Sequence, residues 1–154
     1  MWVSGHIGEG KIVCIATDPG PNQWKVVKEI IMEGQGGGNL FVKSHPKSTH
    51  LWADRALSTD PELQRSIFVY DTKSLELIKT FKVPEKYKGR AVHIEYNKGG
   101  DEAWVSVWGK KDETTSAILI FDDKKLTLKD VIDGDWLITP TGKFNVYNTA
   151  NDIY

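Results

Sequence analysis

Residues 66–75 read Ser-Ile-Phe-Val-Tyr-Asp-Thr-Lys-Ser-Leu, and residues 117–126, which start 51 positions later, read Ala-Ile-Leu-Ile-Phe-Asp-Asp-Lys-Lys-Leu. Each copy is an apolar run that ends in Asp and a short polar turn, and Asp favours such turns by bonding to its own backbone. Upstream, residues 50–53 match residues 102–105, and residues 11–27 form a weaker third copy. The chain is therefore built from a unit of about fifty residues, the length of a propeller blade.

The apolar runs are short, rich in Val, Ile, Phe, Tyr and Trp, and separated by turn residues, which predicts an all-β fold. We expect strands at 11–17, 24–31, 39–44, 50–54, 66–71, 75–82, 91–96, 102–108, 116–121, 126–132 and 143–147, and one helical turn at 61–65. The 154 residues then give about three four-stranded blades, whereas closed propellers hold roughly four to eight. We therefore expect residues 1–154 to be one piece of a larger propeller; a small, self-contained β-sandwich is the competing interpretation.

The composition excludes several classes of function. Lys and Arg total 20 and Asp and Glu total 21, so the net charge of −1 offers no positive field to nucleic acid. No run approaches the ~18 apolar residues of a membrane span, and residues 1–6 lack the features of a signal peptide. We expect neither nucleic-acid binding nor membrane insertion. The single cysteine, Cys14, lies in an apolar run and is expected to be a buried core residue.

The most unusual segment is Gly-Gln-Gly-Gly-Gly at residues 34–38. Its glycines permit positive φ angles and close backbone approach. The segment is followed by a strand and not by a helix, which excludes a phosphate-binding loop. Two interpretations stay open: a tight loop between blades, or a loop that presses its backbone against a flat ligand.

The polar and aromatic residues do not assign a reaction by themselves. The four histidines have no zinc-site spacing, and no catalytic residue can be assigned from spacing, so neither a metal ligand nor a catalytic group is placed. Most of the six tryptophans are expected in the core between blades. Trp104 and Trp108 should share one face of their strand, with Val105 and Val107 on the other, because alternate residues point the same way.

Three segments carry a family resemblance: residues 34–48, which contain Gly-Gln-Gly-Gly-Gly-Asn-Leu-Phe followed by His-Pro, residues 95–108, and residues 139–149. Together they resemble the haem d1 domain of cytochrome cd1 nitrite reductases, and the resemblance extends over nearly the whole chain. It implies that the chain is the C-terminal part of an eight-bladed, haem d1-binding β-propeller domain.

By this resemblance, the full-length parent reduces nitrite to nitric oxide in denitrification and is a periplasmic homodimer. Its electrons come from a c-type haem in a domain absent from this chain. The resemblance places Gln35 and Phe41 near the haem d1 ring, Trp108 on the pocket wall, and Thr141 and Gly142 near the ring's carboxylates. The axial and distal histidines belong to upstream regions of the family, so the chain alone is expected to be inactive.

Two other functions stay open. A haem d1 biosynthesis or carrier protein would share the propeller and bind haem d1 without turning over nitrite. A non-catalytic propeller scaffold would bind another protein instead. The sequence also departs from the family, because His93 stands where the family often has Gln.

Overall fold

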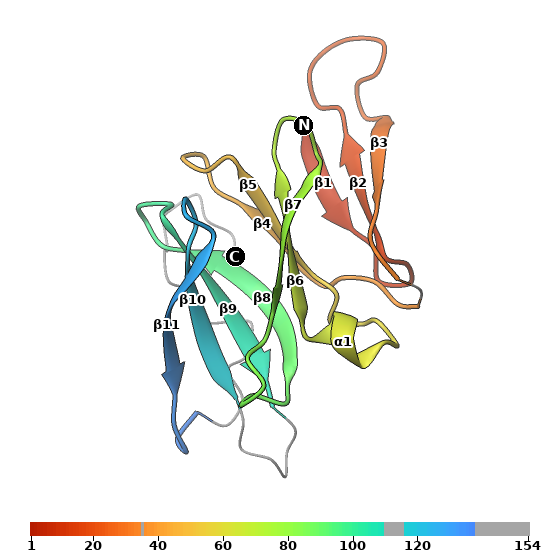
Figure 1. Ribbon diagram of the computed structural model, residues 1–154. Helices are drawn as coiled ribbons and strands as arrows, with labels where there is room; N and C mark the ends of the chain where they lie inside the picture. Colours follow the sequence, from red (N-terminus) through yellow and green to blue (C-terminus); the bar gives the residue numbers. More distant parts are fainter. Residues whose placement is uncertain (35, 110–115, 138–154) are drawn as a thin grey trace.

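The computed structural model describes residues 1–34, 36–109 and 116–137, and these residues form three antiparallel sheets (Figure 1). The first sheet comprises β1 (Trp2–Gly5), β2 (Lys11–Ile15) and β3 (Val26–Ile31). The second comprises β4 (Val42–Ser44), β5 (His50–Asp54), β6 (Ser66–Asp71) and β7 (Leu77–Lys82), with helix α1 (Pro61–Gln64) between β5 and β6. The third comprises β8 (Arg90–Tyr96), β9 (Glu102–Trp108), β10 (Ala117–Asp122) and β11 (Thr127–Asp133). Within each sheet, every strand pairs with the next strand along the chain.

The hairpins β6–β7 and β10–β11 are structural copies of one another, as the repeat predicts. The Asp71 carboxylate accepts hydrogen bonds from the N–H groups of Lys73 and Ser74, both at 2.8 Å, and Asp122 accepts one from Lys125 at 2.8 Å. Leu75 and Leu126, 51 positions apart, both adopt positive φ angles of 60° and 51° at the same place in the turn. The unit of about fifty residues is therefore a real structural unit.

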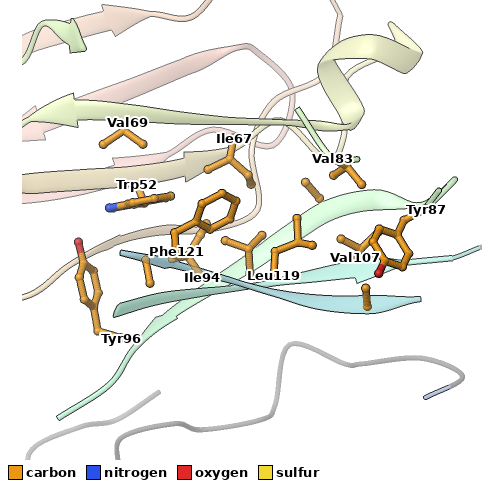
Figure 2. Packing of buried hydrophobic residues seen from close by; sticks show 14 residues of the cluster. Trp52, Ile67, Val69, Val83, Tyr87, Ile94, Tyr96, Val107, Leu119 and Phe121 are labelled. Atoms are coloured by element: carbon orange, nitrogen blue, oxygen red, sulfur yellow. The ribbon is translucent and has the colours of Figure 1, made fainter. Parts of the chain in front are cut away.

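The second sheet is buried on both faces, which is how successive blades pack. Leu51, Ala53, Phe68 and Tyr70 contact Ile12, Cys14 and Ile30 of the first sheet. The alternate residues Trp52, Ile67 and Val69 contact the third sheet, where Ala103, Val105 and Val107 of β9 form part of the same cluster (Figure 2). Because alternate side chains of a strand point to opposite faces, the core is divided into two layers, one between each pair of neighbouring sheets.

The first strands of neighbouring sheets converge, and the last strands diverge. β8 contacts β4, β5 and β6, and β1 contacts β4. Almost every residue of β8 is buried, whereas the last strands, β3, β7 and β11, are largely exposed. The three sheets stand side by side in Figure 1, like the ribs of a fan. The side on which β1, β4 and β8 come together is called the inner side below.

Most expected strands are present within one or two residues, with two differences. The first sheet has a strand, β1, that the sequence analysis missed, and it has three strands instead of four among the described residues. The strand expected from residue 39 starts only at Val42, because the N–H groups of Leu40 and Phe41 donate to the carboxylate of Asp54 and not to a neighbouring strand. The strand expected at 143–147 lies outside the described residues.

The expected burial of the tryptophans was mostly wrong. Only Trp52 is fully buried between sheets, while Trp2, Trp24 and Trp136 are 62%, 65% and 71% exposed. These three lie in an edge strand or in turns, where no second sheet covers them. The expected burial of Cys14 is confirmed.

Candidate functional site

Two of the five residues that the resemblance places near a cofactor can be located. Phe41 and Trp108 are described, whereas Gln35, Thr141 and Gly142 lie outside the described residues. Phe41 and Trp108 line two different pockets, each of about 470 Å³. Both pockets are lined by residues of β8, one by Arg90 and the other by residues 93–95. The candidate site is therefore centred on this inner strand.

The Phe41 pocket is lined by β1, by the segment 39–43 and by residues 93–95. Apolar side chains of Val3, Leu40 and Ile94 form much of its wall. The side chain of Asn39 is 1% exposed, and its Nδ2 has no hydrogen-bond partner among the described residues, although its Oδ1 accepts from the N–H of His6 at 3.0 Å. A buried amide donor without an acceptor is costly, so its presence in a pocket points to a ligand site.

His93 is the most unusual residue of this pocket. It has a φ of 54° and is the extra residue of a β-bulge in β8, between Val92 and Ile94. Bulges of this kind re-aim a side chain and often occur beside active sites. The imidazole packs edge-on against the ring of Phe41, with 4.6 Å between the ring centroids. The sequence alone assigns no role to His93, because a bulge cannot be recognised from the residues.

A charged cluster surrounds this imidazole. The Nε2 atom of His93 lies 3.2 Å from Oε1 of Glu95, and Oε2 of Glu95 lies 3.1 Å from Nζ of Lys43. The side chains of His93 and Glu95 are each 3% exposed, whereas Lys43 is 25% exposed. Glu95 is thus a buried carboxylate shared by two potential cations, one on β8 and one on β4.

The carboxylate of Asp54 holds two backbone segments of this pocket together. Its buried carboxylate accepts hydrogen bonds from the N–H groups of Leu40 at 2.8 Å, Phe41 at 3.2 Å and His93 at 3.3 Å. One side chain therefore holds both pocket segments, the one before β4 and the bulge of β8. Burial outweighs these hydrogen bonds and raises the pKa of Asp54 from 3.8 to about 6.

This pKa gives a testable dependence of stability on pH. Because the folded chain binds the Asp54 proton more tightly than the unfolded chain, the contribution of this group is complete below about pH 4. It is lost as the pH rises through 6, and we expect a loss of about 2–3 kcal/mol. Urea unfolding of the wild type and of Asp54→Asn between pH 4 and pH 7 checks this. A stability difference between the two proteins that does not change with pH would refute it.

The Trp108 pocket combines an aromatic wall with positive charge. Arg90 is paired with Trp108 across β8 and β9, and Arg65 and Lys88 also line the pocket. Arg65 donates to the carbonyl oxygens of Val83 and Tyr87, both at 3.2 Å. Nε1 of Trp108 and Nε of Arg65 are buried and have no hydrogen-bond partner among the described residues. A flat ligand with carboxylates would stack on the Trp108 ring and supply acceptors for these two donors.

The glycines of the segment 34–38 are explained by packing within the chain. Gly34 and Gly36 have φ angles of 81° and 83°, where glycine is favoured. A Cβ atom on Gly37 would overlap the carbonyl oxygen of Leu57, and one on Gly38 would overlap that of His6. The first interpretation, a tight loop between blades, accounts for these glycines, and contact with a ligand stays a prediction.

The described residues hold neither a cluster of metal-ligating side chains nor a helix that could span a membrane. Within residues 1–34, 36–109 and 116–137, no three His, Cys, Asp or Glu side chains are grouped so that they could hold a metal ion. None of the helices in this part of the chain is long and apolar enough to cross a membrane.

Comparisons with known proteins identify relatives of both the sequence and the fold. The model of the cytochrome D1 heme domain family matches residues 1–149. A nitrite reductase of Stutzerimonas stutzeri is 45% identical over 170 aligned residues, which span all of this chain and 30% of the reductase. The chain is thus less than one third as long as this curated relative.

Two solved structures confirm the propeller fold. Dihydro-haem d1 dehydrogenase NirN in complex with DHE matches with a TM-score of 0.68 and 25% identity, over 85% of this chain and 25% of that protein. The β-propeller domain of Cps50 (Swd1) from Myceliophteria thermophila matches with a TM-score of 0.60 and 12% identity, over 86% of this chain and 37% of that one. The second likeness shows the fold alone. The three sheets are therefore successive propeller blades, and the propeller is not closed by the described residues.

Proposed function

The chain belongs to the cytochrome D1 heme domain family, and on this premise we propose that it forms the C-terminal part of the haem d1 domain of a dissimilatory nitrite reductase. The full-length protein would reduce nitrite to nitric oxide. The observation that carries this proposal is the 45% identity to a nitrite reductase over the whole chain. The chain alone, with about three blades, would be inactive.

The described residues fit a flat, carboxylate-bearing macrocycle. Trp108 offers a ring face. Its Nε1, which has no hydrogen-bond partner among the described residues, and the guanidinium of Arg90 are suited to bind carboxylates. Phe41 and the edge of the His93 ring offer a second aromatic wall. When bound, haem d1 would supply the iron that transfers the electron to nitrite. We infer that this chain contributes binding and positioning groups, with Gln35, Thr141 and Gly142 as further contacts.

The longer protein would contain further parts. The nitrite reductase of S. stutzeri is more than three times as long as this chain, which supports the proposal that the remaining blades and a c-type haem domain belong to the same protein. A periplasmic location and a homodimer are part of the same proposal. Nitrite is the proposed substrate, and the c-type haem is the proposed source of electrons.

Replacement of Trp108 tests the proposed binding wall. We expect Trp108→Ala in the full-length protein to weaken haem d1 binding by about tenfold, because it removes a ring face and a hydrogen-bond donor worth together at least 1.4 kcal/mol, roughly the energy of a tenfold change. Absorption titration of the haem d1-free protein measures the affinity. Trp24→Ala is the control, because Trp24 is exposed in the turn between β2 and β3. Equal affinity of the Trp108 variant and the wild type would count against this wall.

A second candidate function has one observation in its favour. NirN, a dihydro-haem d1 dehydrogenase, shares the fold at 25% identity. Its likeness supports a role in haem d1 biosynthesis, although the identity is lower than that to the nitrite reductase. Nitrite consumption by the haem d1-loaded full-length protein separates the two. Steady turnover to nitric oxide supports the reductase, and haem d1 binding without turnover supports the biosynthetic role.

A further inference from the structure

We propose that Ile7 and Leu40 are further cofactor-binding residues, whose exposed side chains contact the haem d1 ring at the Phe41 pocket. This inference rests on the proposed function and adds two contacts that the family resemblance does not assign. Ile7 lies in the loop between β1 and β2, and Leu40 lies in the segment before β4. Both residues line the Phe41 pocket.

Both side chains are exposed to solvent although they are large and apolar. Ile7 is 71% exposed and Leu40 is 38% exposed. A single exposed apolar residue is ordinary on a soluble protein and would carry no conclusion. Here two of them come from separate loops and line one pocket together with Phe41 and Val3. Their common location points to an apolar ligand surface that covers both.

The backbone that carries these side chains is held by hydrogen bonds to other parts of the chain. The carbonyl oxygen of Ile7 accepts from the N–H of Gly38 at 2.8 Å, which joins the two loops. The N–H of Leu40 donates to the buried carboxylate of Asp54 at 2.8 Å. The two apolar side chains therefore stand on a fixed backbone, and such preorganisation lowers the cost of binding a ligand.

The rest of the pocket lining indicates which ligand covers the two side chains. Phe41, which the resemblance places near the haem d1 ring, directly follows Leu40 in the chain and lines the same pocket. Lys43 and Glu95 also line this pocket, so it offers apolar, aromatic and charged groups together. A flat macrocycle with polar substituents suits this mixture, because its ring can lie against the apolar side chains. Haem d1 is therefore the proposed occupant, and a neighbouring propeller blade is the alternative.

Replacement of the two side chains tests the contact in the full-length, haem d1-free protein. We expect Ile7→Ala and Leu40→Ala each to weaken haem d1 binding about tenfold in an absorption titration, because each removes most of an apolar side chain that the ring would cover. The matched controls are Ile31→Ala and Leu77→Ala. These side chains are 73% and 47% exposed on the last strands β3 and β7, outside the lining of the Phe41 pocket, and both controls should bind as the wild type does.

Urea unfolding without haem d1 separates the cofactor from a neighbouring blade as the group that covers these residues. If the cofactor covers Ile7 and Leu40, both variants should unfold at the same urea concentration as the wild type when haem d1 is absent. A lower unfolding midpoint combined with unchanged haem d1 affinity would show that another part of the protein covers the two side chains. That result would overturn the inference.

Methyl NMR gives a readout of the contact that is independent of affinity. Haem d1 should strongly shift the methyl signals of Ile7 and Leu40 on binding, because a macrocycle changes the magnetic field at the methyl groups beside it, and should leave those of Ile31 and Leu77 in place. Unshifted Ile7 and Leu40 signals in a protein that binds haem d1 would overturn the inference. A folded wild-type protein that takes up no haem d1 would instead overturn the proposed function, so the two failures are distinguishable.

Discussion

Asp123→Ala is expected to lower the free energy of unfolding by about 3–5 kcal/mol, the range measured when one partner of a buried polar cluster is removed. The Asp123 carboxylate accepts hydrogen bonds at 2.7 Å from Nε1 of Trp52, from the hydroxyl of Tyr96 and from Oγ of Ser48. Asp123 itself is 4% exposed. The variant would leave the buried donors of Trp52 and Tyr96 and the half-buried hydroxyl of Ser48 without this acceptor.

This cluster joins two blades, which makes the expected effect large. Trp52 lies in β5 of the second sheet, and Ser48 in the turn before β5. Tyr96 ends β8 of the third sheet, and Asp123 follows β10. Trp52 and Tyr96 both lie in the core between the two sheets (Figure 2). Burial and the neighbouring Asp123 carboxylate raise the pKa of Tyr96 well above its ordinary value, so its hydroxyl stays a donor at any pH of interest. The cluster therefore fixes how the third blade sits on the second.

Urea unfolding of the full-length protein measures this effect, with Asp130→Ala as the matched control. Asp130 is exposed on the last strand, β11, and among the described residues its carboxylate accepts only from the N–H of Val131. The control should change stability by about 0.5 kcal/mol or less. An Asp123 variant as stable as this control would show that the cluster does not hold the blades together.

Gly38→Ala is expected to lower the free energy of unfolding by about 3 kcal/mol, because overpacking of this kind typically costs 1–3 kcal/mol and occasionally more. A Cβ atom there would overlap the carbonyl oxygens of both His6 and Glu9, and neither can move as the end of a flexible side chain could. The N–H of Gly38 also donates to the carbonyl oxygen of Ile7 at 2.8 Å. The variant would push apart the loops of the first and second sheets.

The control for this variant is Gly8→Ala, in the loop between β1 and β2. A Cβ atom on Gly8 would meet nothing within 4 Å, so its stability should change little. Thermal unfolding and haem d1 uptake of both variants can be compared directly. Equal stability of the two would contradict the close packing of the segment 34–38.

The repeat of the hairpin and the alternation of apolar residues were sufficient to predict the blades, because both are local signals. The positions of Val105 and Val107 on the face opposite Trp104 and Trp108 followed from the strand period alone. β1 was missed because residues 2–5 have neither an apolar alternation nor a turn signal in front of them. The start of β4 at Val42 depends on the carboxylate of Asp54, which is distant in sequence.

The candidate site was only partly predictable. Phe41 and Trp108 came from the family resemblance, and the structure shows that they line two different pockets and not one common pocket. The position of His93 depends on a β-bulge, so single-strand patterns could not reveal it. The size of an aromatic side chain does not by itself predict burial, as the exposed side chains of Trp2, Trp24 and Trp136 show.

The central claim is that these blades contribute one side of a haem d1 site. The most direct test is absorption titration of the full-length, haem d1-free protein with haem d1. Our account predicts saturable, stoichiometric binding that Trp108→Ala weakens and Trp24→Ala does not. No uptake of haem d1 by the correctly folded full-length protein would contradict it.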